Sequence, residues 1–101
     1  MTYVYLWRYV VRPGSASVFE AAYGPDGDWV RLFKEADGYL DTQLLRDLAD
    51  PRTYLTIDRW TSRVAWEEFR TARAAEWNEI DRRCQDLTER EEEIGRFEEI
   101  R

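Results

Sequence analysis

The sequence of 101 residues contains no histidine and a single cysteine. Histidine is the commonest general base and the usual proximal haem ligand, so its absence excludes Ser-His-Asp and Cys-His nucleophile systems and histidine-ligated haem. Because Cys84 stands alone, neither an intrachain disulfide nor a cysteine metal cluster can form. We therefore predict a protein without a bound metal or cofactor, in a cytoplasmic setting.

Other features that would identify a partner are missing too. Gly24 and Gly27 are spaced like a turn and lack the Lys-Ser/Thr that completes a phosphate-binding loop. Residues 1–12 have neither a charged leader nor a small-residue cleavage site, and their apolar run is too short to span a bilayer. The net charge of -6 and the pI near 4.7 argue against nucleic acid. We expect no membrane or nucleic-acid partner.

Aromatic residues, in contrast, are abundant. The chain has five tryptophans, six tyrosines and four phenylalanines, more aromatic bulk than one small core needs. The hydrophobic fraction of 44% and the charged fraction of 36% are typical of a globular protein, and the length predicts one domain over residues 1–101.

The hydrophobic pattern predicts an α+β fold. Strands are expected where β-branched and aromatic residues dominate, and helices where apolar residues recur every three or four positions. The order of expected elements is strand 3–12, helices 16–23 and 29–36, strands 39–48 and 52–60, helix 62–87 and strand 94–100. This βαββαβ order is the ferredoxin-like arrangement, a four-stranded antiparallel sheet with helices on one face. The acidic run 89–93 is expected to be a solvated turn.

The segment 50–69 is the most informative for the fold. A β-rich run ends at Trp60, and Thr61 and Ser62 are residues that favour a helix start. Only Asp50-Pro51 and their neighbours separate the second and third strands, so an antiparallel hairpin is expected. The stripe that predicts one long helix consists of Trp66, Phe69, Arg73, Trp77, Ile80, Cys84 and Leu87.

The first strand predicts how the chain associates. Its alternate side chains are Tyr3, Tyr5, Trp7 and Tyr9 on one side, and Val4, Leu6 and Val10 on the other. A sheet with one face in water alternates between apolar and polar residues, and this strand does not. Since the helices cover only one face, we predict that a second copy covers the other, in a symmetric homodimer.

Four segments resemble the antibiotic biosynthesis monooxygenase family: RPGSASVFEAAYG, GDWVRLFKEADGYL, YLTIDRWTSRVAWEEF and DLTEREEEIGRF. The most specific part is Trp60 at the strand end, followed by Ser62 and Trp66. The resemblance implies a dimeric α+β barrel, with a small apolar pocket between the helices and the sheet of each subunit. Active members of this family oxidise aromatic polyketide-type phenols without metal or flavin, or cleave haem.

Two departures from the family pattern affect the chemistry. Quinone-forming members have an asparagine four residues before the tryptophan, where this chain has Thr56. Haem-cleaving members have a first-strand asparagine, here Trp7, and a helix histidine, which this chain lacks. Haem degradation through an axial histidine is therefore not expected, and cofactor-free oxygenation loses a polar anchor.

The residues that we predict to line a ligand pocket are Trp60, Trp66, Thr56, Trp7, Arg8 and Tyr23. For the tryptophans the alternative is a place in the core or the dimer interface. Asp58 and Arg8 are charged residues inside strands, so each needs a partner if it is buried. A structural ion pair at the interface is the simpler interpretation, and a general base with a shifted pKa is the alternative for Asp58.

Three hypotheses about function remain open. The first is a protein of this family that binds a flat hydrophobic or aromatic small molecule, with cofactor-independent oxidation of a phenol as its activity. The pocket would orient the substrate and exclude water, while Arg8 or a tyrosine stabilises the developing oxyanion. The second is a non-catalytic binding or accessory homodimer. The third is a structural dimer that has no enclosed pocket.

Overall fold

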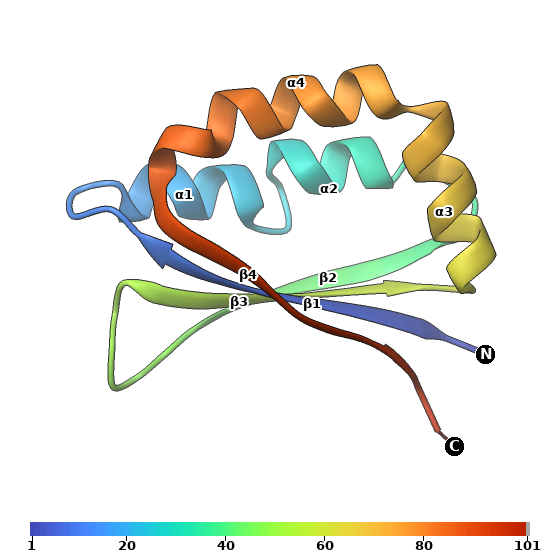
Figure 1. Cartoon of the computed structure of the whole chain (residues 1–101), viewed down its shortest axis with the longest axis horizontal. Coiled ribbons are helices and arrows are strands. Elements are labelled where there is room, and N and C mark those ends of the chain that lie inside the picture. The colour runs from blue at the N-terminus through green and yellow to red at the C-terminus, as the bar shows by residue number, and fades with distance from the viewer. Residues whose placement is uncertain (101) are drawn as a thin grey trace.

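The computed structural model, which describes residues 1–100, has two layers: a sheet and the helices that cover one of its faces (Figure 1). The predicted βαββαβ order is confirmed. The elements are β1 (Tyr3–Val11), α1 (Ala16–Tyr23), α2 (Asp28–Phe33), β2 (Tyr39–Arg46), β3 (Thr53–Trp60), α3 (Arg63–Ala72), α4 (Ala74–Cys84), a short 3-10 turn η1 (Gln85–Leu87) and β4 (Thr88–Glu98).

The four strands lie in the order β2-β3-β1-β4, and all neighbours are antiparallel. The hairpin expected between the second and third strands is confirmed by the pairing of β2 with β3. β1 and β3 are the central strands, so their alternate residues contribute to both faces of the sheet. No helix within residues 1–100 lies on the opposite face of the sheet (Figure 1).

The prediction of one helix over residues 62–87 is wrong, because the chain bends at Arg73. This residue leaves helical geometry (φ -114°, ψ 30°), ends α3 and begins α4. Its side chain ion-pairs with Glu35 at 3.0 Å and lies over the ring of Phe69. On either side of the bend, Phe69 from α3 and Trp77 from α4 pack against the same core cluster.

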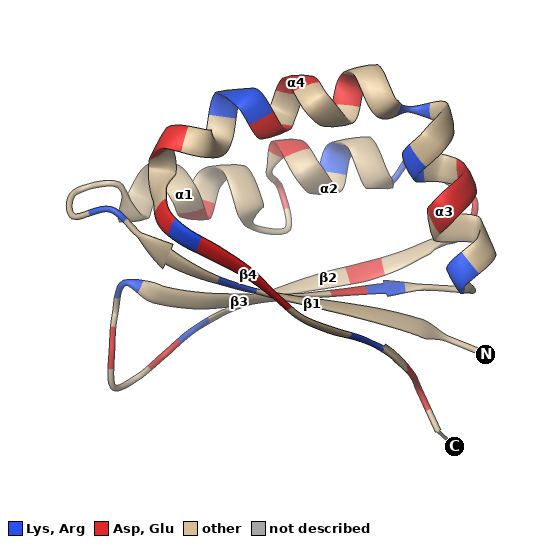
Figure 2. Cartoon of the chain, in the orientation of Figure 1, with Lys and Arg blue, Asp and Glu red and all other residues tan. Residues whose placement is uncertain are grey.

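The last strand begins at Thr88 rather than at residue 94, so the predicted solvated turn over residues 89–93 is also wrong. The acidic residues pair along β1, with Glu92 opposite Arg8 and Glu91 opposite Tyr9. Acidic residues colour the first part of β4 in Figure 2. β4 is an edge strand, where charged side chains are common because they discourage pairing with other chains. The run of glutamates is therefore part of an edge strand and not the predicted turn.

The covered face of the sheet is packed with aromatic rings. Trp60 is fully buried, and its ring meets Phe33 and Tyr39 edge to face at 5.5 and 5.4 Å between centroids. At the start of α3 the Ser62 Oγ accepts a hydrogen bond from the Ala65 N–H at 3.0 Å, the cap that the sequence predicts. This cap fixes α3 directly after Trp60, over the end of the sheet.

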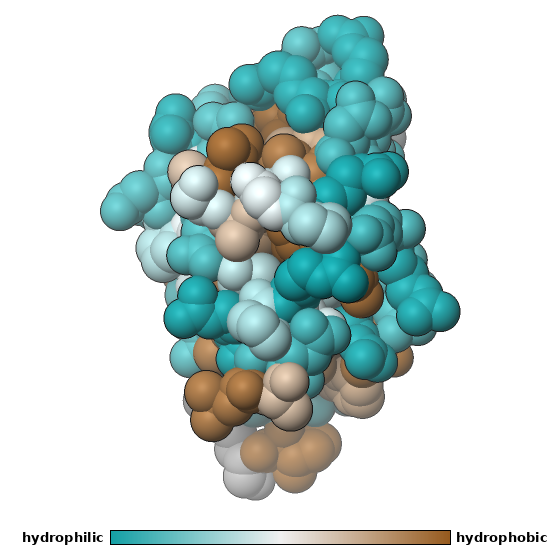
Figure 3. All heavy atoms as spheres, turned by 90° about the vertical axis from the view of Figure 1, so that its left-hand side faces the viewer, coloured by the Kyte–Doolittle hydropathy of each residue, from teal (hydrophilic) through white to brown (hydrophobic). Residues whose placement is uncertain are grey.

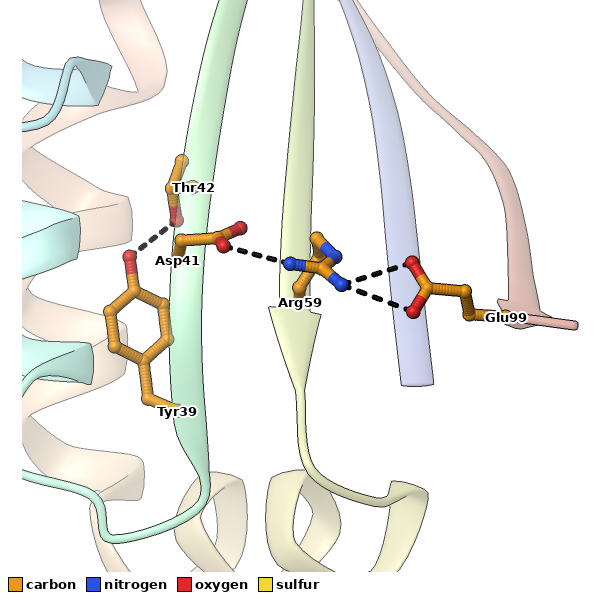
Figure 4. A network of polar contacts seen from close by, with 5 residues as sticks. All are labelled: Tyr39, Asp41, Thr42, Arg59 and Glu99. Atoms are coloured by element: carbon orange, nitrogen blue, oxygen red, sulfur yellow. Dashed lines mark hydrogen bonds and ion pairs between the residues drawn. The ribbon is translucent and has the colours of Figure 1, made fainter. Parts of the chain in front are cut away.

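The uncovered face mixes apolar side chains with ion pairs. Leu6 and Ile57 are paired across β1 and β3, and Phe97 of β4 is half exposed. Arg59 ion-pairs with Asp41 and with Glu99, both at 2.9 Å (Figure 4). Figure 3 shows hydrophobic residues at the lower end of the view, beside the sheet, and a second group of them among hydrophilic residues in its upper half.

Candidate ligand-binding site

A cavity of about 350 Å³ lies between the covered face of the sheet and the helices. The sheet, α1, α2, α3 and α4 all contribute to its wall. Its lining residues are Tyr5, Trp7, Tyr9, Tyr23, Trp29, Phe33, Thr42, Thr56, Asp58, Trp66, Arg70, Trp77, Asp81, Glu91 and Arg96. The cavity is therefore mainly aromatic, with a small set of polar groups.

Strand register organises the floor of the cavity. One residue from each strand forms a row across the sheet: Arg96 of β4, Tyr5 of β1, Asp58 of β3 and Thr42 of β2. Trp7 and Thr56 form the next row. Opposed side chains on one face of an antiparallel pair lie about 5 Å apart, so these groups are direct neighbours.

The walls are aromatic rings set at an angle to one another. Trp66 and Trp77 meet edge to face at 6.2 Å, and Trp29 packs on Trp77 at 5.4 Å and on Phe33 at 5.9 Å. Rings in such arrangements prefer offset or edge contacts with further rings. The walls therefore suit a flat aromatic molecule.

Asp58 is the carboxylate on the floor. The Thr42 hydroxyl donates a hydrogen bond to Asp58 Oδ1 at 2.6 Å, and the Tyr39 hydroxyl donates to Thr42 Oγ1 at 2.8 Å, as Figure 4 shows for the latter. Within residues 1–100 no cation forms an ion pair with Asp58. Burial raises its pKa to about 6, helped slightly by the charge of Asp41 and opposed by the Thr42 hydrogen bond. At neutral pH this carboxylate can accept a proton.

Two arginines lie at the cavity: Arg96 on β4, at the end of the row opposite Thr42, and Arg70 on α3. The Arg96 guanidinium lies over Tyr5 at 4.9 Å and over Trp66 at 5.0 Å, and donates to Glu93 at 2.9 Å. Its hydrogen bond with Glu93 raises the pKa of Arg96 above the ordinary value, so it stays charged. Arg70 lies over Trp77 at 4.8 Å.

Two acidic side chains, Asp81 of α4 and Glu91 of β4, complete the polar part of the wall. Burial raises the pKa of Glu91 above its usual value. Glu91 also accepts a hydrogen bond from the Thr88 hydroxyl at 3.2 Å. The cavity thus holds charged groups of both signs, with the carboxylate of Asp58 on its floor.

Four of the six residues predicted to bind a ligand line this cavity: Trp7, Tyr23, Thr56 and Trp66. Trp60 does not, because it is sealed between Phe33 and Tyr39, and its indole N–H has no hydrogen-bond partner among residues 1–100. Arg8 points away from the cavity, since strand alternation places it on the uncovered face, where it ion-pairs with Glu92 at 3.3 Å. Ligand binding by the six residues stays a prediction.

Several lining residues escaped the sequence-based prediction. Asp58 was expected chiefly as an interface ion pair, although its position two residues after Thr56 places both on one face of the strand. Arg96 could not be selected, because only the pairing of β4 with β1 brings it beside Tyr5. Trp77 could have been selected, because it belongs to the apolar stripe of the predicted helix and so was expected to face the sheet.

Other kinds of site find no support in the described part of the chain. Within residues 1–100, there is no group of three or more histidine, cysteine, aspartate or glutamate side chains that could hold a metal ion. None of the helices in this range has the length and apolar character that crossing a membrane requires.

Comparison with known proteins identifies relatives. The family model described as antibiotic biosynthesis monooxygenase matches residues 2–76. SnoaB, a cofactor-independent oxygenase from Streptomyces nogalater, is 20% identical, with a TM-score of 0.73 over 99% of this chain and 94% of SnoaB. A structure from Bordetella bronchiseptica that bears the family's name is 17% identical, with a TM-score of 0.75 over 98% and 97% of the two chains. No curated protein matches the sequence. At these identities the structural likeness establishes the fold alone.

Proposed function

This chain belongs to the antibiotic biosynthesis monooxygenase family, and from that premise we propose that it binds a flat aromatic molecule in the cavity above Asp58 and oxidises it with dioxygen without a cofactor. The observation that carries the proposal is the aromatic cavity with one unpaired carboxylate on its floor. The likeness to SnoaB, a cofactor-independent oxygenase, agrees with it.

The size of the cavity limits the ligand. Small-molecule sites span roughly 300–1,000 Å³, and the cavity of about 350 Å³ is near the lower end. A ligand of a few fused rings fits this volume better than a long polyketide chain. Trp66 and Trp77 would hold its faces and edges, and Arg96 would face an oxygen substituent.

The chemistry that we propose needs little from the protein. A hydroxyanthrone-type substrate loses a proton from its activated CH₂ group and becomes an electron-rich anion. Dioxygen accepts electrons from this anion and forms a C–O bond, and protonation gives a hydroperoxide. Loss of water from the hydroperoxide leaves a carbonyl, so substrate and dioxygen yield a quinone and one water. The cavity orients the substrate, excludes bulk water and stabilises the oxyanion through Arg96.

The test uses 1,8-dihydroxyanthrone as substrate, with oxygen uptake and quinone absorbance as readouts. We expect a rate above that of buffer, and a lower rate in Trp66→Ala, because the flat substrate loses part of its wall. Val64→Ala, a truncation of an exposed residue on the same helix, is the matched control. A wild-type rate equal to the buffer rate would refute the oxygenase proposal.

A non-catalytic binding protein is the second candidate. It is favoured by Thr56, which stands where quinone-forming members have asparagine and whose hydroxyl already shares a hydrogen bond with Tyr9 at 3.2 Å. A single hydroxyl cannot supply the paired donor and acceptor of an amide. Saturable quenching of tryptophan fluorescence by the anthrone, without oxygen uptake, would support this candidate against the first.

The proposed assembly is a homodimer through the uncovered sheet face. Its apolar residues, such as Leu6 and Ile57, are not covered by any helix of residues 1–100. A second copy offers the same mixture of apolar residues and ion pairs, as an isologous interface requires. The cytoplasmic setting inferred from the single cysteine also stays a prediction.

A further inference from the structure

A chain of hydrogen bonds leads away from the floor of the cavity. The Tyr39 hydroxyl donates to Thr42 Oγ1 at 2.8 Å, and the Thr42 hydroxyl donates to Asp58 Oδ1 at 2.6 Å. Each hydroxyl has one proton, so the direction of donation is set from Tyr39 toward the carboxylate. Asp58 and Thr42 line the cavity, while Tyr39 lies outside its wall and keeps partial exposure to water.

The surroundings of Asp58 favour proton acceptance over ion pairing. The titratable groups that share its cavity are Tyr5, Tyr9, Glu91 and Arg96 on β1 and β4, Tyr23 on α1, Arg70 on α3 and Asp81 on α4. From β2, Tyr39 reaches it through Thr42, and the charge of Asp41 acts on it from the uncovered face. The cation in its own row, Arg96, is two strands away, which is about 10 Å between backbones. A carboxylate desolvated in this way holds a proton more tightly than one in water.

We infer that Asp58, Thr42 and Tyr39 form a proton-transfer path, in which Asp58 takes a proton from a carbon acid bound in the cavity and the two hydroxyls pass it to solvent. This inference rests on the proposed function, and it names the groups that would prepare the substrate. Asp58 touches the substrate and is the catalytic base. Thr42 and Tyr39 act through it.

The steps balance without a co-reactant. The substrate C–H bond breaks, its electron pair stays on the substrate, and an O–H bond forms on Asp58. Once Asp58 holds this proton, the Thr42 and Tyr39 hydroxyls rotate so that their own protons point away from it. Asp58 then gives its proton to Thr42 Oγ1, Thr42 gives its own proton to the Tyr39 oxygen, and Tyr39 releases its proton to water. One proton leaves the cavity, and the transfer itself leaves the two hydroxyl protons directed toward Asp58 again.

The experiment separates proton abstraction from oxidation. Under anaerobic conditions in D₂O, exchange of the CH₂ protons of 1,8-dihydroxyanthrone is followed by NMR at several pH values. The wild-type protein is expected to accelerate exchange, with a rate that falls as the pH drops below about 6, where Asp58 becomes protonated. Asp58→Asn is expected to lower the rate by roughly 10²–10⁴-fold, the usual contribution of a general base, and to lose this pH dependence.

The relay has its own test. In Thr42→Val the proton held by Asp58 returns to the substrate more often than it leaves. The rate of hydrogen exchange is therefore expected to fall by a larger factor than the rate of aerobic oxidation. Tyr39→Phe is expected to show the same difference between the two rates, but a smaller one. Gln43→Ala is the matched control, since it changes a polar side chain on the same strand as Thr42, at an exposed position outside the cavity.

The outcomes distinguish the two proposals. Exchange that depends on Asp58, without oxygen uptake, would support the base and refute the oxygenase. Oxygen uptake with exchange equal in the wild type and Asp58→Asn would refute the base and leave the oxygenase. Acetate in the buffer should restore exchange in Asp58→Gly, and an absence of rescue would count against Asp58 as the base. Equal losses of exchange and oxidation in Thr42→Val would refute the relay.

Discussion

Asp58 and Arg59 are neighbours in the sequence but lie on opposite faces of the sheet, and the two faces treat charge differently. Arg59 lies on the uncovered face, where Asp41 and Glu99 pair with it (Figure 4). Asp58 faces the cavity, where it has hydroxyl neighbours and no paired cation within residues 1–100. The pKa of Asp58 therefore moves to about 6, because desolvation is not balanced by an opposite charge.

The two faces also differ in cover. On one face, helices seal Trp60 completely and lie over the cavity. On the other, Leu6 and Ile57 lie among ion pairs, and no helix of residues 1–100 lies above them. The helices therefore give one face a core of its own, whereas the apolar residues of the other face are left without such a layer.

The largest expected effect comes from the sealed part of the covered face. Trp60→Ala removes a fully buried indole and leaves a cavity between Phe33 and Tyr39. The free energy of unfolding, measured by urea denaturation, is expected to fall by about 3–5 kcal/mol. Val64→Ala, at an exposed position, should change it by less than about 0.5 kcal/mol. A loss below about 1 kcal/mol in Trp60→Ala would contradict the packing described.

Asp58→Asn tests the charge on the covered face through stability. The folded pKa of about 6 lies above the unfolded value near 3.8, so the proton on Asp58 favours the folded state fully below pH 4. This contribution is lost as the pH rises through 6. The free energy of unfolding of Asp58→Asn, relative to that of the wild type, should therefore increase by up to about 3 kcal/mol between pH 4 and pH 8. Parallel stability curves for the two proteins would rule out a raised pKa.

Ile57→Lys tests the uncovered face. A lysine at the centre of a sheet-to-sheet interface would be buried without a partner, and the dimer dissociation constant should rise at least about 100-fold, or about 2.7 kcal/mol. Light scattering over a dilution series measures the change. Leu48→Lys, in the fully exposed β2–β3 connection, is the control. A wild-type protein that is monomeric at micromolar concentration would refute the interface.

Arg59→Gln should have the smallest effect. The Arg59 side chain keeps about a third of its exposure to water while it pairs with Asp41 and Glu99. Such pairs contribute little to stability, because water and salt screen them. Urea denaturation should therefore show a loss of stability much smaller than that of Trp60→Ala, and added salt should reduce it further. A loss as large as that of Trp60→Ala would show that the network is desolvated, and that the two faces differ less than the structure indicates.

Most of the fold could be predicted from local patterns. The run of β-branched and aromatic residues in β1, the short connection before β3 and the cap at Ser62 each depend on residues close in sequence. The two errors have a common cause. The bend at Arg73 and the strand over residues 89–93 involve distant partners, Glu35 for the first and β1 for the second.

The site was predictable only in part. Trp7, Thr56, Trp66 and Tyr23 were selected as aromatic or family-matched residues, and all four line the cavity. Trp60 was selected for the same reason, but it is fully buried beneath the cavity wall. The residue type alone does not show how completely the helices cover the end of a strand.

By itself the sequence determined the order of the elements, the aromatic character of the interior and the absence of histidine chemistry, because these depend on composition and on periods of two and three to four residues. Only the tertiary structure decided which charged groups share the cavity. The register of four strands places Arg96, Tyr5, Asp58 and Thr42 in one row, and the helices above them remove water from Asp58. Register and desolvation arise from contacts between distant segments, so a single strand's pattern cannot specify them.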